Sequence, residues 1–152
     1  MPDPKPNLVA QYQTLLVIWG ALLMSQAIFI VVLFVAKGEL FEFRFDQSIA
    51  GGNGIITLAF AIAALTSVAG SFVIKRRFYE RAVTEQKIEH IVTGLINALA
   101  LCEVSALIGM CLALVFDYQF FFAFFALGIL GMLLHFPRQD DILAAGYKGP
   151  TK

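Results

Sequence analysis

The sequence predicts an all-α polytopic membrane protein, a single domain over residues 1–152 with four transmembrane helices arranged as two hairpins. Three observations lead to this fold class. Apolar residues make up 59% of the chain. Charged residues make up only 14%, whereas a soluble domain carries about a quarter. Four long apolar runs are separated by polar segments, and about 20 apolar residues are enough to cross the hydrocarbon of a bilayer.

The four predicted spans cover residues 14–36, 55–74, 91–116 and 120–136. The polar segment 75–90 contains no Pro or Gly, so we expect it to extend the second and third helices beyond the membrane. The three residues 117–119 are too few for anything but a tight turn between the third and fourth helices. We expect the first apolar run to be a retained helix, because no complete small-residue cleavage site follows it.

The segment 37–54, between the first two spans, carries aromatic residues at every second position. Phe41, Phe43 and Phe45 alternate there with charged residues. A period of two predicts an extended segment with the three rings on one side. We expect these rings to lie at the membrane interface. At the other end of the second span, the interface is marked by the basic cluster Lys75, Arg76 and Arg77.

The distribution of basic residues predicts the orientation of the chain. Nine of the eleven Lys and Arg residues fall at the termini or between the second and third spans. Because cytoplasmic segments carry an excess of Lys and Arg, we expect both termini to be cytoplasmic, in a bacterial cytoplasmic membrane. The net charge of zero gives no electrostatic reason to expect nucleic acid. The expected partners are membrane lipids and other membrane subunits or copies of the chain.

Glu103 is the sharpest clue to function, because it lies at the centre of the third span. Placing an acid there costs about 2.5–3.5 kcal/mol even on the lenient insertion scale, and such residues normally carry ions or protons. Three other polar residues lie near the same depth, and we expect them to converge with Glu103 on an ion- or proton-binding site: Gln26, Thr66 and Ser67. The alternative is a structural Glu103 that fixes helix packing by bonding to Gln26 or Thr66. We expect Ser25 and Ser105 to bond to their own helix backbones.

Small residues at four-residue spacing mark close helix contacts, because they let two backbones approach. The second span carries Ala59, Ala63, Ser67 and Ser71, and the third carries Gly94, Ala98, Cys102 and Ala106. These two stripes pack helices within the bundle or, alternatively, pack neighbouring protomers.

No resident cofactor, metal site or catalytic centre is expected. The sequence contains no His/Cys/Asp cluster, Gly-rich phosphate loop or nucleophile elbow, so we do not expect an enzyme. One run is dense in aromatic residues: Phe120, Phe121, Phe122, Phe124 and Phe125. We expect it to be lipid-facing bulk, with a groove for a bound lipid, quinone or pigment as the alternative.

The first and third spans resemble each other weakly. When residues 19–28 are superposed on residues 96–105, Gln26 falls on Glu103. The match favours two duplicated hairpins, and chance similarity between apolar segments is the alternative.

The segment 100–114 reads Ala-Leu-Cys-Glu-Val-Ser-Ala-Leu-Ile-Gly-Met-Cys-Leu-Ala-Leu. It resembles the ion-carrying helix of rotary ATPase subunit c, the proteolipid, and especially its V-type form. In that helix a central Glu is followed by an apolar stretch with Leu, Gly and a final Ala-Leu at similar offsets. The resemblance implies that Glu103 is the ion-binding carboxylate and that Gln26 is the degenerate acid position of the first hairpin.

The resemblance covers about 15 residues, and the chain departs from the family elsewhere. The first two spans lack the dense Gly repeat of the family's inner helix, and the charge rule turns both hairpin loops outward. Our first hypothesis is therefore a small accessory or structural subunit of a larger, bioenergetic membrane complex. The alternative is a proteolipid-like proton or cation carrier that uses Glu103 in a homo-oligomeric ring. A small stand-alone transporter is a third hypothesis.

Overall fold

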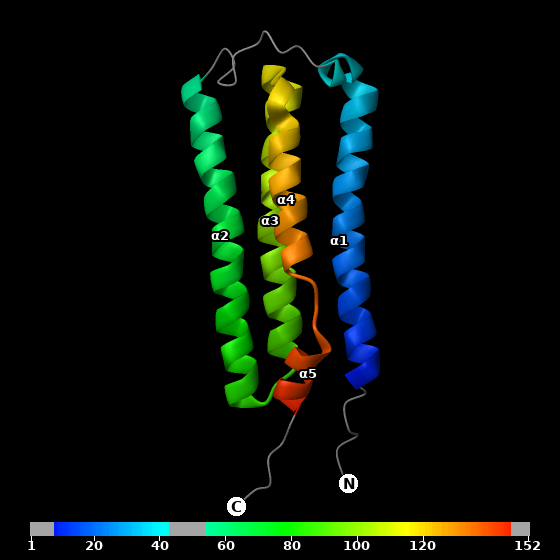
Figure 1. The fold of residues 1–152 in the computed structure, drawn as a ribbon, viewed down its shortest axis with the longest axis vertical. Helices are drawn as coiled ribbons and strands as arrows, with labels where there is room; N and C mark the ends of the chain where they lie inside the picture. Colours follow the sequence, from blue (N-terminus) through cyan, green and yellow to red (C-terminus); the bar gives the residue numbers. More distant parts are fainter. Residues whose placement is uncertain (1–7, 43–53, 147–152) are drawn as a thin grey trace, which may run out of the picture.

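The computed structural model describes residues 8–42 and 54–146 and confirms the all-α fold class. Figure 1 shows the long helices running side by side, with the start of α1, the α2–α3 turn and α5 at one end. The elements in chain order are α1 (Leu8–Ala36), the 3-10 turn η1 (Gly38–Phe41), α2 (Gly54–Glu85), α3 (Glu89–Phe116), the 3-10 turn η2 (Gln119–Phe121), α4 (Phe122–Leu134) and α5 (Gln139–Gly146).

Three helices, α1, α2 and α3, are long and apolar enough to cross a membrane. A fourth span is obtained only if Gln119–Leu134 and Gln139–Ala145, which are bent by 52° relative to each other, count as one broken span. The 13 residues of α4 rise about 20 Å, less than the roughly 30 Å of bilayer hydrocarbon. Pro137 follows closely, and its ring and missing N–H prevent the helix from continuing straight. The chain is thus a multi-pass membrane protein with three or four spans.

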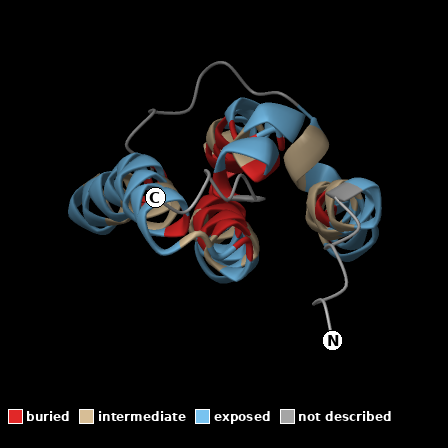
Figure 2. Cartoon of the chain, turned by 90° about the horizontal axis from the view of Figure 1, so that it is seen from below, coloured by how far each residue is buried: buried red, intermediate tan, exposed pale blue. Residues whose placement is uncertain are grey.

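The helix α3 is the centre of the bundle. It makes its most extensive contacts with α2, then with α4 and α1. Viewed along the bundle, α1 and α2 lie on opposite sides of the α3–α4 pair, and the buried residues gather where α3 and α4 face each other (Figure 2). The prediction of two packed hairpins is therefore correct for α3 and α4 but wrong for α1 and α2, which are sequential yet have almost no contact.

The two predicted features that flank α3 are present. The charged segment 75–90 is helical up to Glu85 and again from Glu89, so it extends α2 and α3 as expected. The turn after α3 is tight: Asp117 adopts a left-handed conformation with φ 51°, and the N–H of Tyr118 bonds back to the Leu112 carbonyl. Lys37 after α1 reaches across to the Asp117 carboxylate at 2.5 Å, which ties the end of α1 to this turn.

The extended segment predicted after the first span is wrong where the structure describes it. Residues 38–41 form a 3-10 turn, closed by hydrogen bonds from Leu40 N–H to Lys37 O and from Glu42 N–H to Glu39 O. The ring of Phe41 contacts Phe34 and Phe121 edge-on, with centroids 5.3 Å from each. The conformation of this segment is therefore set by aromatic packing of Phe41 against the bundle and not by the period-two pattern. Phe43 and Phe45 lie outside the described residues.

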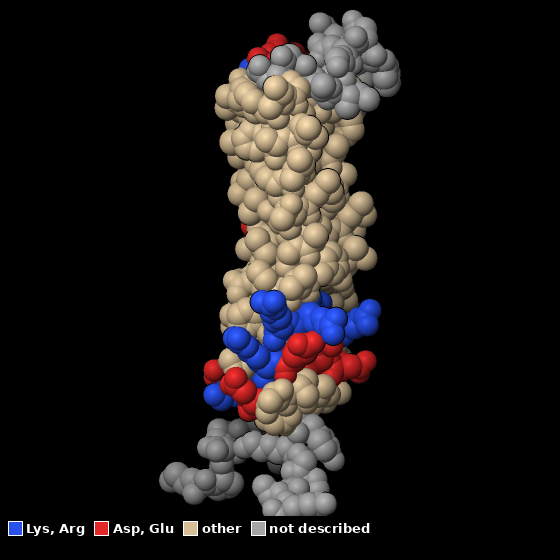
Figure 3. All heavy atoms as spheres, turned by 90° about the vertical axis from the view of Figure 1, so that its left-hand side faces the viewer, with Lys and Arg blue, Asp and Glu red and all other residues tan. Residues whose placement is uncertain are grey.

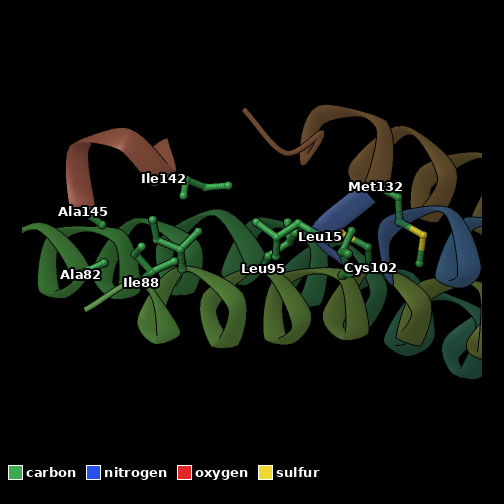
Figure 4. Close-up of a cluster of buried hydrophobic side chains, with 10 residues drawn as sticks. Leu15, Ala82, Ile88, Leu95, Cys102, Met132, Ile142 and Ala145 are labelled. Carbon is green, nitrogen blue, oxygen red and sulfur yellow. The ribbon is translucent and has the colours of Figure 1, made fainter. Parts of the chain in front are cut away.

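The short helix α5 was not predicted. It lies at the lower end of the bundle, where Ile142 and Ala145 are buried in the same apolar cluster as Ala82 of α2 (Figure 4). The same cluster includes Leu15 of α1, so α5 closes the lower end of the bundle. Figure 3 shows Lys, Arg, Asp and Glu gathered at this end, below a long band that is almost entirely uncharged.

Candidate functional site

Glu103 lies midway along α3, about 20 Å from either end of the helix. Its side chain is partly exposed on the outer surface between α3 and α1. The carboxylate atom Oε1 lies 2.5 Å from the hydroxyl of Ser25 on α1. Glu103 thus meets a neighbouring helix at mid-membrane, but it stays accessible from outside the bundle.

The hydroxyl of Ser25 has two oxygen neighbours. Besides Glu103, the main-chain carbonyl of Leu22 lies 2.7 Å away. A hydroxyl has one proton to donate. Ser25 Oγ is the donor in both contacts, so its one proton is shared between the Leu22 carbonyl and Oε1 of Glu103. Ser25 bonds to its own helix backbone as expected, and its contact with Glu103 makes it the polar partner that was not predicted. The same expectation is wrong for Ser105, whose hydroxyl donates to the Phe124 carbonyl on α4 at 2.8 Å.

Gln26 does not join Glu103. Its side chain is fully buried, and Nε2 lies 3.3 Å from the sulfur of Met132 on α4. Its Oε1 has no hydrogen-bond partner among the described residues. The two neighbours Ser25 and Gln26 point to different helices, so only Ser25 reaches Glu103.

The two polar residues of α2 also stay apart from Glu103. The hydroxyl of Thr66 is exposed and donates to the Ile62 carbonyl at 2.7 Å, within its own helix. Ser67 is partly exposed, and within the described chain no hydrogen bond joins it to Glu103. The predicted convergence of four polar side chains is therefore wrong, as is the expectation that Gln26 or Thr66 bonds to Glu103. The different surroundings of Gln26 and Glu103 also give no structural support to their proposed equivalence in an internal repeat.

A second polar group, not predicted from the sequence, lies in the core where α4 ends. The Nε2 of His135 is 3.3 Å from the Ser71 hydroxyl, and its Nδ1 is 2.6 Å from the Gly131 carbonyl. The thiol of Cys102 is 3.5 Å from the same hydroxyl. All three side chains are fully buried. They join α2, α3 and the end of α4, and the only sequence signal was a His immediately before the Phe136-Pro137 break.

The two small-residue stripes have different surroundings. Gly94, Ala98, Cys102 and Ala106 of α3 are all buried, and a Cβ at Gly94 would lie 2.6 Å from Cβ of Phe78 on α2. This stripe packs helices within the bundle. On α2, Ser71 is buried and Ser67 partly exposed, whereas Ala59 and Ala63 are exposed on the outer face. The half of the α2 stripe formed by Ala59 and Ala63 is therefore available to contact another helix.

The Phe-rich run is mostly core and not lipid-facing bulk. Phe121, Phe124 and Phe125 are buried and pack with Tyr118 against α3. Phe122 is 40% exposed and Phe120 is partly exposed. An apolar groove of about 470 Å³ borders this region between α2 and α4, lined partly by Phe124 and Leu127. The buried rings hold α4 on α3, and the groove beside them offers no charged group.

The remaining predicted residues lie at the charged end. Arg76 pairs with Glu80 at 2.8 Å, and the ammonium of Lys75 lies 5.1 Å from the ring centre of Tyr79. Arg77 is exposed. Across the described ranges, no group of three or more His, Cys, Asp or Glu side chains is placed to hold a metal ion.

The chemistry available to this site depends on the Glu103 carboxyl. A carboxyl that faces outward at mid-membrane can bond to a neighbouring protein or exchange a proton or cation with one. Comparisons of the chain with protein-family models, curated proteins and solved structures find no match.

Proposed function

We propose that this chain is a small structural subunit of a larger, bioenergetic membrane assembly and that it contacts its neighbours through the face bearing Glu103. The observation that carries the proposal is the partly exposed carboxyl at mid-membrane, with Ser25 as its only hydrogen-bond partner in the described residues. Ionisable groups at this depth are costly against lipid and normally face protein or water. A neighbouring subunit on this face removes the carboxyl from lipid.

Two further features support association with other helices. Among the described side chains of α1 only Leu15, Gln26 and Leu33 are buried, so much of its surface is available to lipid or to a partner. The exposed Ala59 and Ala63 on α2 allow a second backbone to approach closely. The described chain also has little mass outside the helices, which suits a subunit whose contacts are within the membrane.

The alternative is a proteolipid-like proton or cation carrier, in which copies of the chain form a ring. The contact between Glu103 and Ser25 supports this candidate. A carboxyl that donates to Ser25 when protonated and accepts from it when ionised has a partner in both states. Its partial exposure also allows a neighbouring subunit to exchange the proton.

Glu103→Gln separates the two candidates. The amide keeps the shape and can donate to Ser25 Oγ, but it cannot titrate. In a structural subunit, assembly should change by less than about 1 kcal/mol, the worth of a typical hydrogen bond, and the activity of the parent assembly should survive. In a carrier, assembly should persist while proton or cation flux into proteoliposomes is lost. Glu89→Gln, an exposed acid at the start of the same helix, is the matched control.

Mass determination after gentle detergent extraction completes the test. Co-purification with unlike subunits supports the structural proposal, and a ring of identical chains supports the carrier. A hydrophobic carbodiimide should modify Glu103 only if its protonated form is reached from lipid. A monomeric chain whose Glu103→Gln and Glu103→Leu variants behave like the parent would contradict both candidates.

We also propose that the charged end lies on the cytoplasmic side of a bacterial cytoplasmic membrane. The start of α1, the α2–α3 turn and α5 share that end, which carries most of the basic side chains. The positive-inside rule then places both termini in the cytoplasm.

A further inference from the structure

An open groove of about 570 Å³ runs along the outer surface between α2 and α3, away from the Phe-rich run. Its floor is formed largely by apolar or small residues of α3, namely Ala100, Leu101 and Val104. Its mouth carries two arginines of α2, Arg77 and Arg81. The groove therefore joins an apolar stretch of α3 to two arginine side chains.

The two arginines lack carboxylate partners in the part of the chain that the structure describes. They lie four residues apart on one face of α2, and both are exposed. The acids nearby are engaged elsewhere: Glu80 pairs with Arg76 at 2.8 Å, and Glu85 contacts His90 at 2.9 Å and Lys87 at 3.5 Å. The guanidinium groups of Arg77 and Arg81 are thus available to an external anion.

The depth of the groove matches the profile of a bilayer. Arg77 stands three residues beyond Ile74, where the apolar part of α2 gives way to the charged end. From Asn97 to Val104 the groove follows α3 for about 10 Å toward the middle of the membrane. The arginines consequently lie at headgroup level, and the floor lies at the level of the acyl chains.

We propose that this groove is a binding site for an anionic phospholipid. The lipid phosphate pairs with Arg77 and Arg81, whose planar guanidinium groups match phosphate geometry. One acyl chain lies along Leu101 and Val104, where it covers apolar surface. Free phosphate would use the arginines but leave the floor empty, whereas a phospholipid fills both parts. This site is independent of Glu103 and of the function proposed for it.

The proposal predicts that the chain prefers an anionic to a zwitterionic phospholipid. Native mass spectrometry of the purified full chain, titrated with phosphatidylglycerol or phosphatidylcholine, measures this preference. The parent should retain phosphatidylglycerol preferentially. Each basic side chain near an anionic lipid is worth about fivefold in affinity, so Arg77→Gln/Arg81→Gln should weaken phosphatidylglycerol binding by about twenty-five-fold. The matched control Arg76→Gln removes the same type of charge one residue away, from an arginine that already has a partner, and should change binding less than twofold.

A second variant tests the apolar half of the groove. Ala100→Phe fills the floor without changing charge, and the exposed position of Ala100 makes the larger ring tolerable to the fold. It should weaken the binding of phosphatidylglycerol. Unaltered binding in this variant would show that no acyl chain lies there and would overturn the proposal. An equal loss in Arg76→Gln, or full displacement of the lipid by millimolar inorganic phosphate, would overturn it as well. Unchanged thermal unfolding of each variant confirms that the bundle is intact.

Discussion

Gly128 on α4 is the residue whose substitution tests the central helix contact most directly. The helix α4 approaches α3 so closely that a Cβ at position 128 would lie 2.9 Å from the main-chain carbonyl oxygen of Cys102. It would also lie 3.2 Å from Nε2 of the fully buried Gln26. The first neighbour is backbone and cannot rotate away. Gly128→Ala must therefore separate α3 from α4, and it also crowds the Gln26 amide.

The magnitude is the difference between two opposing effects. Overpacking a well-packed contact costs about 1–3 kcal/mol. Replacing Gly by Ala inside a helix contributes about 1 kcal/mol in the opposite direction. Gly128→Ala should accordingly lower the free energy of unfolding by up to about 2 kcal/mol. Gly70→Ala on α2 is the matched control, because a Cβ there meets nothing within 4 Å. It should raise stability by up to about 1 kcal/mol.

Unfolding in mild detergent can be followed through Trp19, the only tryptophan. Its indole donates to the Met132 carbonyl at 2.8 Å and contacts the ring of Phe136, so its fluorescence reports the α1–α4 contact. The two alanine variants should differ by about 1–3 kcal/mol, the packing contribution alone. Equal stabilisation by both would refute the close approach of α3 and α4.

Two other predictions concern the two ends of the bundle. Asp117 raises the pKa of Lys37 chiefly through their side-chain hydrogen bond. The pKa of Lys37 in the folded chain therefore lies above its unfolded value of 10.5. The stabilisation by the Lys37–Asp117 pair is complete below pH 10.5 and is lost as the pH rises through the folded pKa. Asp117→Asn, which tolerates the left-handed backbone, should lower the melting temperature at pH 8, and the difference should vanish once Lys37 is neutral. For orientation, in a Cys111→Ala background an impermeant maleimide should label Glu39→Cys from outside and Glu85→Cys only after lysis. The reverse pattern would place the charged end outside.

The sequence predicted the features that depend on composition and length. The long apolar runs, the helical extension through Arg81 and the tight turn at Asp117 follow from the apolar residues, the absence of Pro and Gly, and the shortness of the connection. The buried stripe from Gly94 to Ala106 was also recognisable, because small residues at four-residue spacing allow close contact whichever helix lies opposite.

What could not be predicted depends on how each helix is rotated. Because α1 is apolar on all sides, its sequence does not reveal that Ser25 faces Glu103 while Gln26 faces α4. The sequence likewise does not reveal the order of the helices around α3, and this order decides which polar side chains come into contact. The helix α5 was missed for a different reason: its eight residues are too few for a clear pattern, and it is held by the burial of Ile142.

The position of α1 has a consequence for how the chain is made. Nearly all the surface on which α1 rests belongs to α3, α4 and α5, which follow it in the sequence, and it has almost no contact with α2. During synthesis α1 and α2 enter the membrane before α3, α4 and α5, the helices that α1 packs against, have been made. Lipid must solvate α1 until α3 and α4 have been inserted, so the bundle closes only when the last third of the chain is complete.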